Sequence, residues 1–310
     1  MRIYRYASNR GGLQPRLAIA APEKPPCDLI DSWQELEGGA LPPYLTSVAT
    51  LIEQGPEFWQ RIEDLAQRAA DESNLHVQEI EWEVTWLCPF DAIASLRDFL
   101  AFESHVKLGA ARRGGEVPAY WYEAPVYYKG NHRSIIGPEE ICPWPSYTTM
   151  LDFELELAMV IGTRGRDVPA AEGASHVFGF TVMNDFSARD IQSKEMSAWL
   201  GPAKGKDFAT ALGPCIVTAS EVGAAPDLQM ICRVNGEEWG RARSSQMHWS
   251  WEQIIEHASR DEDIFPVDVY GSGTPGGCCG LDIGRNLSPG DEVELEIESI
   301  GVLRNPIARI

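Results

Sequence analysis

Hydrophobic and polar residues alternate over several short stretches in the second half of the chain. In LDFELELA, the first part of LDFELELAMVIG (residues 151–162), leucine and phenylalanine occupy the odd positions, and the even positions hold Asp152, Glu154, Glu156 and Ala158. A period of two is typical of a β-strand, whose successive side chains point to opposite faces. Strands are predicted in the same way for HVFGFTVMND, ALGPCIVT, LQMICRVNG and DEVELEIESIGVL, the last of which follows a Ser-Pro-Gly turn.

Two stretches in the first half have the spacing of a helix instead. Phe58, Ile62, Leu65 and Ala69 recur at intervals of three and four, which predicts a helix with one packed face. A second pattern, SLRDFLAFESHVKLGAARRGG, covers residues 95–115 and ends in two glycines, a common stop signal. We therefore expect two helical segments ahead of the β-rich half.

The order of these elements predicts the fold class. Strands and long helices do not alternate regularly, so a doubly wound sheet is not expected. The 310 residues are 44% hydrophobic, enough for a sizeable core. We predict an α+β, mostly β protein built as a roll or barrel, with an N-terminal region over residues 1–90 and the main domain over residues 91–310.

Charge and cysteine content narrow the class of partner and the location. Asp and Glu number 46 against 26 Lys and Arg, a net charge of −20 that repels nucleic acid and anionic lipid. No run of about 18 apolar residues that could cross a membrane is present, and we expect a cytoplasmic protein. The seven cysteines form no Cys-x-x-Cys motif, so we expect reduced thiols rather than disulfides or a zinc ribbon.

Glu154 and Glu156 are the strongest candidates for chemistry. Residues two apart on a strand point to the same side, about 7 Å apart. An isolated Glu-x-Glu is most often the solvent face of an amphipathic strand. However, Asp185 ends a second predicted strand, and three carboxylates suit a hard cation such as Mg²⁺, Mn²⁺ or Ca²⁺.

Two glycine-rich segments resemble known loops only superficially. GPAKGKD lacks the glycine spacing and the hydroxyl residue of a phosphate-binding loop. GSGTPGG is not the nucleophile elbow of a serine hydrolase. It is either a flexible turn or, through its backbone N–H groups and Thr274, a site for an oxyanion or carboxylate.

Five segments together resemble the fumarylacetoacetate hydrolase family. ELELAMVIG, GFTVMNDFSARDIQ, GPAKGKDFATALGP, GSGTPGG and LSPGDEVELEIESIGVLRNPI follow one another in the family's order, from about Leu96 to Ile310. The resemblance implies a mixed β-sandwich roll with one divalent cation, most often Mg²⁺. It implies Glu154, Glu156 and Asp185 as metal ligands, Lys206 as a catalytic residue, and Tyr128, Lys129, Arg189, Gln192 and Thr274 as substrate-binding residues.

The same resemblance leads us to expect a catalytic histidine upstream of the tyrosine. AFESHVKLG offers His105, with Glu103 as a candidate partner. Residues two apart lie on different sides of a regular helix, so Glu103 could orient His105 only if this segment is not helical. The family's archetype has an Asp ligand ahead of its histidine, and the nearest aligned position here is Ala101, which leaves the fourth ligand open.

The resemblance implies chemistry on a small anionic oxo-acid. The cation acts as a Lewis acid toward an enolate while His105 activates water, so hydrolysis of a carbon–carbon bond in a β-diketone or acylpyruvate is the first expectation. Decarboxylation, isomerisation, hydration or dehydration of a 2-oxo-acid would use the same site. A non-catalytic binding protein on this scaffold is the alternative of another class. The family also implies a homodimer.

Overall fold

The largest element is a mixed β-sheet that runs through the middle of the molecule. This computed structural model describes residues 1–9, 12–77 and 84–309. Within them the sheet has eleven strands, in the order β3-β2-β1-β14-β12-β10-β18-β5-β6, with β4 beside β1 and β7 beside β14. Its strands are β1 (Arg2–Ser8), β2 (Arg16–Ala20), β3 (Cys27–Asp28), β4 (Val84–Leu87), β5 (Ser95–Phe99), β6 (Tyr127–Lys129), β7 (Ile135–Ile136), β10 (Leu155–Ile161), β12 (Val177–Asp185), β14 (Thr210–Thr218) and β18 (Asp268–Gly271).

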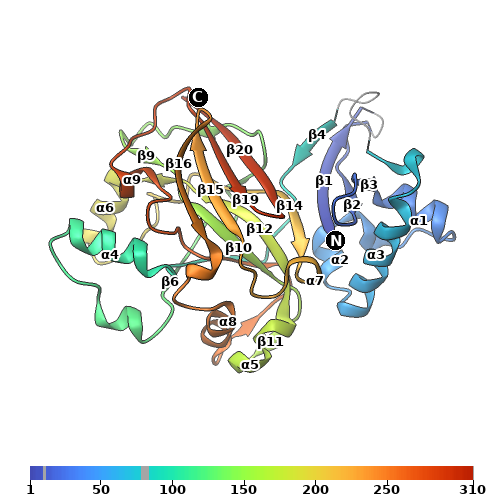
Figure 1. Cartoon of the computed structure of the whole chain (residues 1–310), viewed down its shortest axis with the longest axis horizontal. Helices are drawn as coiled ribbons and strands as arrows, with labels where there is room; N and C mark the ends of the chain where they lie inside the picture. Colours follow the sequence, from blue (N-terminus) through green and yellow to red (C-terminus); the bar gives the residue numbers. More distant parts are fainter. Residues whose placement is uncertain (10–11, 78–83, 310) are drawn as a thin grey trace.

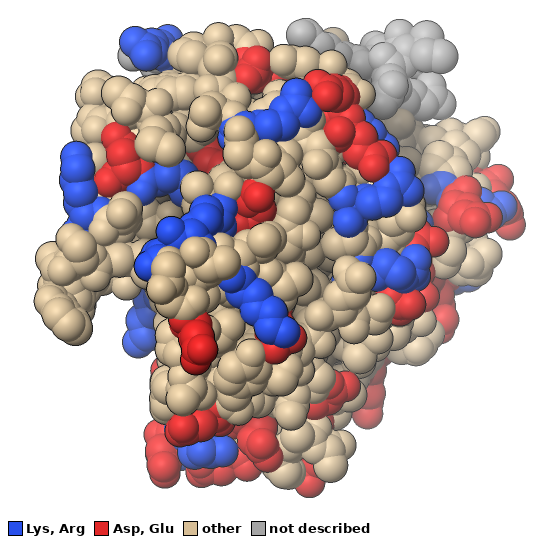
Figure 2. Space-filling view, turned by 60° about the vertical axis from the view of Figure 1, so that its left-hand side comes forward, with Lys and Arg blue, Asp and Glu red and all other residues tan. Residues whose placement is uncertain are grey.

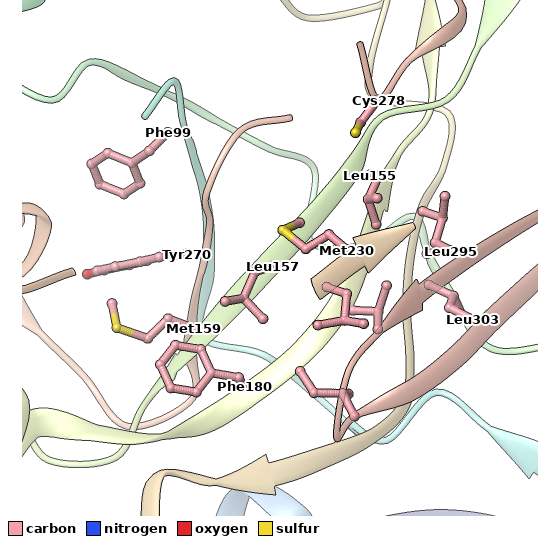
Figure 3. Close-up of a cluster of buried hydrophobic side chains, with 14 of the residues drawn as sticks. Phe99, Leu155, Leu157, Met159, Phe180, Met230, Tyr270, Cys278, Leu295 and Leu303 are labelled. Atoms are coloured by element: carbon pink, nitrogen blue, oxygen red, sulfur yellow. The ribbon is translucent and has the colours of Figure 1, made fainter. Parts of the chain in front are cut away.

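A second sheet of five strands packs against the large one. Its order is β16-β15-β19-β20-β8, and its strands are β8 (Cys142–Pro143), β15 (Gln229–Val234), β16 (Glu237–Arg243), β19 (Glu292–Ile297) and β20 (Gly301–Ala308). Leu155 and Leu157 of the large sheet meet Met230, Leu295 and Leu303 of the small one in a continuous apolar core (Figure 3). The predicted β-sandwich roll is confirmed, and the large sheet is open rather than closed into a barrel.

Two short antiparallel strand pairs and a set of helices complete the described fold. The pairs join β9 (Leu151–Asp152) to β13 (Ser187–Ala188) and β11 (Gly165–Arg166) to β17 (Asp263–Ile264). The α-helices are α1 (Leu29–Leu36), α2 (Val48–Ile52), α3 (Pro56–Ala69), α4 (Glu103–Arg112), α5 (Ala170–Gly173), α6 (Arg189–Ser197), α7 (Ala219–Val222), α8 (Trp251–Ser259) and α9 (Gly280–Ile283). The 3₁₀ turns are η1 (Pro43–Thr46), η2 (Ser73–Leu75), η3 (Ala119–Tyr122), η4 (Ala174–His176) and η5 (Ser244–Gln246).

The N-terminal region is attached to the main domain through the large sheet. Strand β1 pairs with β14, with Ile3 opposite Ile216, so the first strand of the chain extends the sheet that the second half builds. Helices α1 to α3 lie on the same side of the molecule as β1 and β2 (Figure 1). The helix predicted around Ile62 and Leu65 is confirmed as α3, and these two residues are buried. The boundary at residue 90 remains a prediction.

The helix predicted over residues 95–115 is wrong in its first third. Residues Ser95–Phe99 form β5, which pairs in parallel with β18 and in antiparallel with β6. The helix α4 begins only at Glu103. Leu96 and Phe99 fit a helical spacing, but hydrogen bonds to two neighbouring strands override this weak local preference.

Strand β10 is buried on both faces. Leu155 and Leu157 pack toward the five-stranded sheet, whereas Ala158 and Val160 pack into a second apolar cluster with residues of α2 and α3. Glu156 is 1% exposed. The interpretation of Glu-x-Glu as a solvent face is therefore excluded, and these carboxylates need another explanation.

The helices and the surface bear on two expectations from the sequence, on membrane spans and on charge. No helix in the described residues is both long enough and apolar enough to cross a membrane. Figure 2 shows acidic and basic side chains interspersed over one face of the molecule, with neither sign forming a continuous field there.

Candidate active site

Four carboxylates converge on the part of the large sheet where the strands run in the order β12-β10-β18-β5. Asp98 lies in β5, Glu154 just before β10, Glu156 in β10, and Asp185 at the end of β12. All four are buried. Carboxylate oxygens of Asp98, Glu156 and Asp185 lie within 4.8 Å of one another, and we call these three residues the carboxylate cluster. The sequence predicts Glu154, Glu156 and Asp185 as metal ligands, whereas the three mutually close carboxylates are those of Asp98, Glu156 and Asp185.

Glycines between the strands make room for the cluster. Gly271 of β18 faces Ala158 of β10 on one side and Asp98 of β5 on the other. A Cβ on Gly271 would lie 2.6 Å from Oε2 of Glu156 and 2.9 Å from Oδ1 of Asp98. The backbone N–H of Gly273 donates a 3.0 Å hydrogen bond to Oε2 of Glu156. The GSGTPGG segment thus orients a carboxylate through its backbone.

The electrostatics of the cluster favour a bound cation. Burial raises the pKa of Asp98, with a further contribution from Asp185; burial likewise raises the pKa of Glu156, with a further contribution from Asp98. Oδ1 of Asp98 and Oε1 of Glu156 are buried without a hydrogen-bond partner among the described residues. Unpartnered buried carboxylate oxygens are costly unless a cation neutralises them. The residues therefore fit a divalent metal ion with hard oxygen ligands.

Glu154 is held outside the cluster by two cations. Its Oε1 lies 2.9 Å from Nη1 of Arg189, and its Oε2 accepts a 2.6 Å hydrogen bond from Nζ of Lys206. Burial alone would raise the pKa of Glu154, but Arg189 and Lys206 outweigh it and lower the pKa. Lys206 also donates to Asp185, and to Oγ of Ser187 at 2.7 Å. Its ammonium therefore links Glu154 to the carboxylate cluster.

Arg189 and Tyr128, both predicted to bind substrate, extend this polar network. Arg189 lies 2.7 Å from Oδ2 of Asp152 and donates a 3.2 Å hydrogen bond to Oε1 of Gln192. Asp152 in turn accepts hydrogen bonds from the backbone of Gly280 and Leu281 at the start of α9. The hydroxyl of Tyr128 donates to Oδ1 of Asp185 at 2.9 Å.

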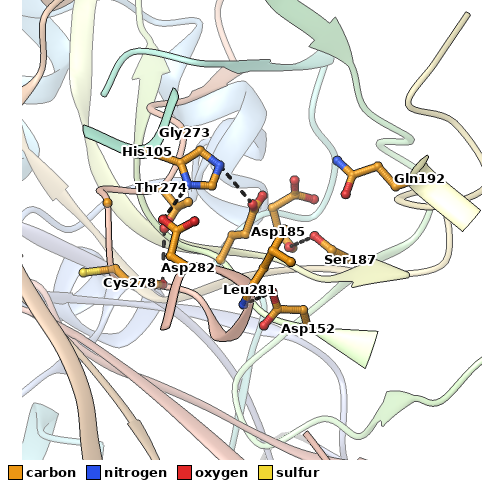
Figure 4. A network of polar contacts seen from close by, with 12 residues as sticks. His105, Asp152, Asp185, Ser187, Gln192, Gly273, Thr274, Cys278, Leu281 and Asp282 are labelled. Carbon is orange, nitrogen blue, oxygen red and sulfur yellow. Dashed lines mark hydrogen bonds and ion pairs between the residues drawn. The ribbon is translucent and has the colours of Figure 1, made fainter. Parts of the chain in front are cut away.

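His105 joins the site from helix α4, and its partner is an aspartate far along the chain. Nδ1 of His105 lies 2.7 Å from Oδ2 of Asp282 in α9, and Nε2 lies 3.8 Å from Oε1 of Glu154 (Figure 4). Arg112 holds Asp282 through its other oxygen at 2.5 Å. The hydrogen bonds to His105, Gly277 and Arg112 outweigh the effect of burial and lower the pKa of Asp282. His105 is 14% exposed at its side chain and is open to solvent.

Glu103 does not partner His105. Its carboxylate accepts a 2.7 Å hydrogen bond from Tyr122 and pairs with Lys107 at 2.9 Å. Because this segment is a regular helix, Glu103 and His105 leave it in different directions. The expectation that Glu103 orients His105 is corrected to Asp282.

Lys129 and Thr274 were also predicted to bind substrate, and that role stays a prediction. Lys129 is exposed and lies opposite Arg97 on β5, whereas its neighbour Tyr128 lies opposite Asp98. Since successive strand residues point to opposite faces, Lys129 is directed away from the carboxylate cluster. Thr274 is buried and its hydroxyl donates to the carbonyl of Cys278 at 3.2 Å, so it stabilises the glycine-rich turn.

Asp98 and Asp282 are the residues that sequence reasoning missed. Ala101 was aligned with the family's additional aspartate, but Asp98, three residues earlier, supplies the carboxylate. Asp98 was hidden within a segment interpreted as helix. No local pattern marks Asp282, because its role depends only on the approach of α9 to α4.

Comparison with known proteins agrees with this fold and site. Residues 95–308 match the C-terminal domain of fumarylacetoacetate hydrolase, so the chain belongs to the fumarylacetoacetate hydrolase family. Over 190 residues it is 37% identical to the mitochondrial oxaloacetate tautomerase FAHD2A of Bos taurus. That match covers 59% of this chain and 59% of the relative, so it spans less than two thirds of the relative's length.

Solved structures establish the shared fold. Fumarylacetoacetate hydrolase from Exiguobacterium antarcticum superimposes over 100% of both chains with a TM-score of 0.74 and 24% identity. Fumarylpyruvate hydrolase from Pseudomonas aeruginosa, solved with Mn²⁺ and pyruvate, covers 70% of this chain and 91% of its own with a TM-score of 0.61 and 23% identity. Family and fold therefore agree, and the carboxylate cluster has the oxygen donors that a divalent metal ion takes.

Proposed function

We propose that this protein hydrolyses a carbon–carbon bond in a small β-diketone acid of the acylpyruvate type. The observation that carries the proposal is the His105–Asp282 pair beside a buried carboxylate cluster. A histidine oriented by a carboxylate is a suitable general base for activating water. The cluster supplies the second requirement, a place for a cation next to that base.

Asp282 determines which nitrogen of His105 carries the proton. As an ionised carboxylate it only accepts hydrogen bonds, so Nδ1 of His105 donates and Nε2 keeps its lone pair. Nε2 is the nitrogen that faces Glu154 and the rest of the site. It can take a proton from a water molecule that attacks a substrate carbonyl, and later return the proton to the carbon that leaves.

The remaining residues bind and orient an anionic substrate. A divalent cation held by Asp98, Glu156 and Asp185 would polarise the substrate oxygens and stabilise the negative charge that bond cleavage releases. We propose Mg²⁺, with Mn²⁺ or Ca²⁺ as alternatives. Lys206 and Tyr128 place donor groups on Asp185 of the cluster, and Arg189 contacts Glu154 and Gln192 nearby. These donors favour a substrate that carries a carboxylate.

A second candidate is tautomerisation of a 2-oxo-acid. The similarity to an oxaloacetate tautomerase at 37% identity favours it. The same base would remove a proton from the carbon next to the oxo group and return it elsewhere, without water as nucleophile. Both reactions would use His105 as the base, so a His105 variant cannot distinguish them. Their products can, because only hydrolysis cleaves the carbon–carbon bond.

A product assay separates the two reactions. The protein loaded with Mg²⁺ or Mn²⁺ is given an acylpyruvate and, separately, the enol form of oxaloacetate, and products are measured by NMR. Pyruvate and a carboxylic acid from the acylpyruvate support hydrolysis; faster enol decay with no cleavage supports tautomerisation. Replacing His105 by Ala is expected to cost about 10²–10⁴-fold in turnover with the metal retained. Absence of both reactions with every metal would favour a non-catalytic binding protein.

We also propose that the chain forms homodimers and acts in the cytoplasm. Light scattering of the purified protein measures the first property. Fluorescence imaging of the tagged full-length protein in its own cells measures the second.

A further inference from the structure

A second group of metal-ligating side chains lies next to the carboxylate cluster but is distinct from it. His105, Cys279 and Asp282 bring an imidazole nitrogen, a sulfur and a carboxylate oxygen within 4.8 Å of one another. We propose that these three residues form an inhibitory site for a soft divalent ion, Zn²⁺ above all. The site itself is independent of the reaction, whereas its inhibitory effect rests on the proposed role of His105.

The donor set distinguishes the two groups chemically. The carboxylate cluster offers only oxygen atoms, which suit Mg²⁺, Mn²⁺ or Ca²⁺. Nitrogen, sulfur and oxygen together suit Zn²⁺, which commonly takes three protein ligands and leaves a fourth position for water. Thiolate is the ligand that Mg²⁺ binds least readily, so the two sites should select different ions.

The three side chains are held in place from opposite sides. Asp282 lies in α9 and His105 in α4, and Arg112 of α4 ties the two helices together by binding Asp282. Cys279 precedes α9 and pairs with Glu154 through an isolated β-bridge, which fixes its backbone beside the active site. These elements hold the three side chains close together, and zinc binding needs the 2.7 Å contact of Nδ1 with Oδ2 to open to the ~3.3 Å that separates two tetrahedral zinc ligands.

The thiol of Cys279 has no other role in the described structure. Its sulfur is fully buried and makes no hydrogen bond to any described residue. The neighbouring Cys278 is equally buried but lies outside the group of three, so it provides a matched control. The exposed edge of His105 offers the ion a path from solvent.

Zinc at this site would block the proposed base by changing its tautomer. In the metal-free pair, Nδ1–H donates to Asp282 and the Nε2 lone pair is free. Zinc between Nδ1 and Oδ2 takes the Nδ1 lone pair, so the proton of the neutral imidazole moves to Nε2. The Cys279 thiol releases its proton to solvent as the sulfur–zinc bond forms. No oxidation occurs, and Nε2 can no longer accept a proton from water.

Cobalt provides a direct probe of the thiolate. Co²⁺ is added to the Mg²⁺-loaded protein, and the near-ultraviolet absorption of a cobalt–thiolate bond is recorded for the parent, Cys279→Ser and Cys278→Ser. The band is expected in the parent and in Cys278→Ser, and it should be absent in Cys279→Ser. Cys279→Ala serves as a second variant if the serine variant does not fold, as judged by circular dichroism. No band in the parent, or an equal band in all folded variants, would overturn the proposal.

Calorimetry and kinetics complete the test. Zn²⁺ is titrated into the Mg²⁺-loaded protein, and Cys279→Ser is expected to bind it at least about tenfold more weakly than Cys278→Ser. Turnover of whichever substrate is active should fall with Zn²⁺ in the parent and recover on chelation, with Cys279→Ser resistant. A thiolate band without inhibition would keep the site but reject its effect on His105. Lack of activity toward all substrates would reject the proposed function while leaving the cobalt result decisive for the site.

Discussion

His105 and Asp282 are 177 positions apart in the chain and 2.7 Å apart in the structure. Helix α4 presents the imidazole and helix α9 presents the carboxylate, while Arg112 holds the other oxygen of Asp282. The imidazole also lies 3.8 Å from Glu154, which Lys206 links to Asp185 of the carboxylate cluster, so the proposed base and the proposed cation site are close together. The roles proposed for this pair and for the cluster can each be tested with single substitutions.

Replacing Asp282 by Asn should impair turnover with the metal site intact. The amide can donate to Nδ1, which favours the tautomer with the proton on Nε2 and removes the base. We expect a loss of about 10²-fold or more in kcat, measured by steady-state kinetics. Glu103→Gln is the matched control and should stay within about threefold of the parent, because the Glu103 carboxylate is bonded to Tyr122 and Lys107 rather than to His105 in the described structure. Equal losses in both variants would contradict the assignment.

Neutralising one carboxylate of the cluster should weaken metal binding. Asp98→Asn and Glu156→Gln keep the shape of each side chain but remove a charge that the cation needs. Calorimetric titration with Mn²⁺ is expected to show about 10–100-fold weaker binding for each variant. Asp207→Asn, a nearby carboxylate outside the cluster, should bind Mn²⁺ like the parent. Unchanged affinity in Asp98→Asn would leave this aspartate without a role in the site.

Removing the buried cation Lys206 should destabilise the metal-free protein. Its ammonium contacts both Glu154 and Asp185, and Lys206→Met leaves two buried carboxylates poorly compensated. A loss of about 3–5 kcal/mol in the free energy of unfolding is expected from urea denaturation. Lys204→Met, at an exposed lysine two residues earlier, should change it by less than about 0.5 kcal/mol. Addition of Mn²⁺ should recover part of the loss; equal stability of the two variants would refute the bridging role.

The buried thiol of Cys215 should make the protein less stable in alkali. Burial raises its pKa from 9.0 to about 12, so the unfolded thiol ionises first as the pH rises. The contribution of this thiol to the free energy of unfolding is complete below pH 9 and is lost progressively between pH 9 and pH 12. In that range the native state binds more protons than the unfolded state, so stability falls as the pH rises. From pH 8 to pH 10 the parent should lose about 1 kcal/mol more than Cys215→Ala. Parallel stability curves for the two proteins would contradict a neutral buried thiol.

The strands and the family could be predicted from the sequence, because both depend on residues that are close together along the chain. The alternation around Glu154 and Glu156 predicted strand β10, and the ordered motifs indicated the family. Lys206, Asp185 and Arg189 were assigned to one site, and the structure brings them together. Strand periodicity and short motifs are local properties, so they can be recognised in the sequence without the tertiary structure.

The tertiary structure determines which carboxylates lie together and which are paired with basic side chains. Asp98 lies close to Glu156 because β5 and β10 flank β18 on either side. Glu154 lies outside the cluster, where its carboxylate is paired with Lys206 and Arg189. Asp282 replaces Glu103 as the partner of His105 because α9 packs on α4. These roles depend on strand order and helix packing between segments far apart in sequence, and no local pattern of side chains encodes such distances.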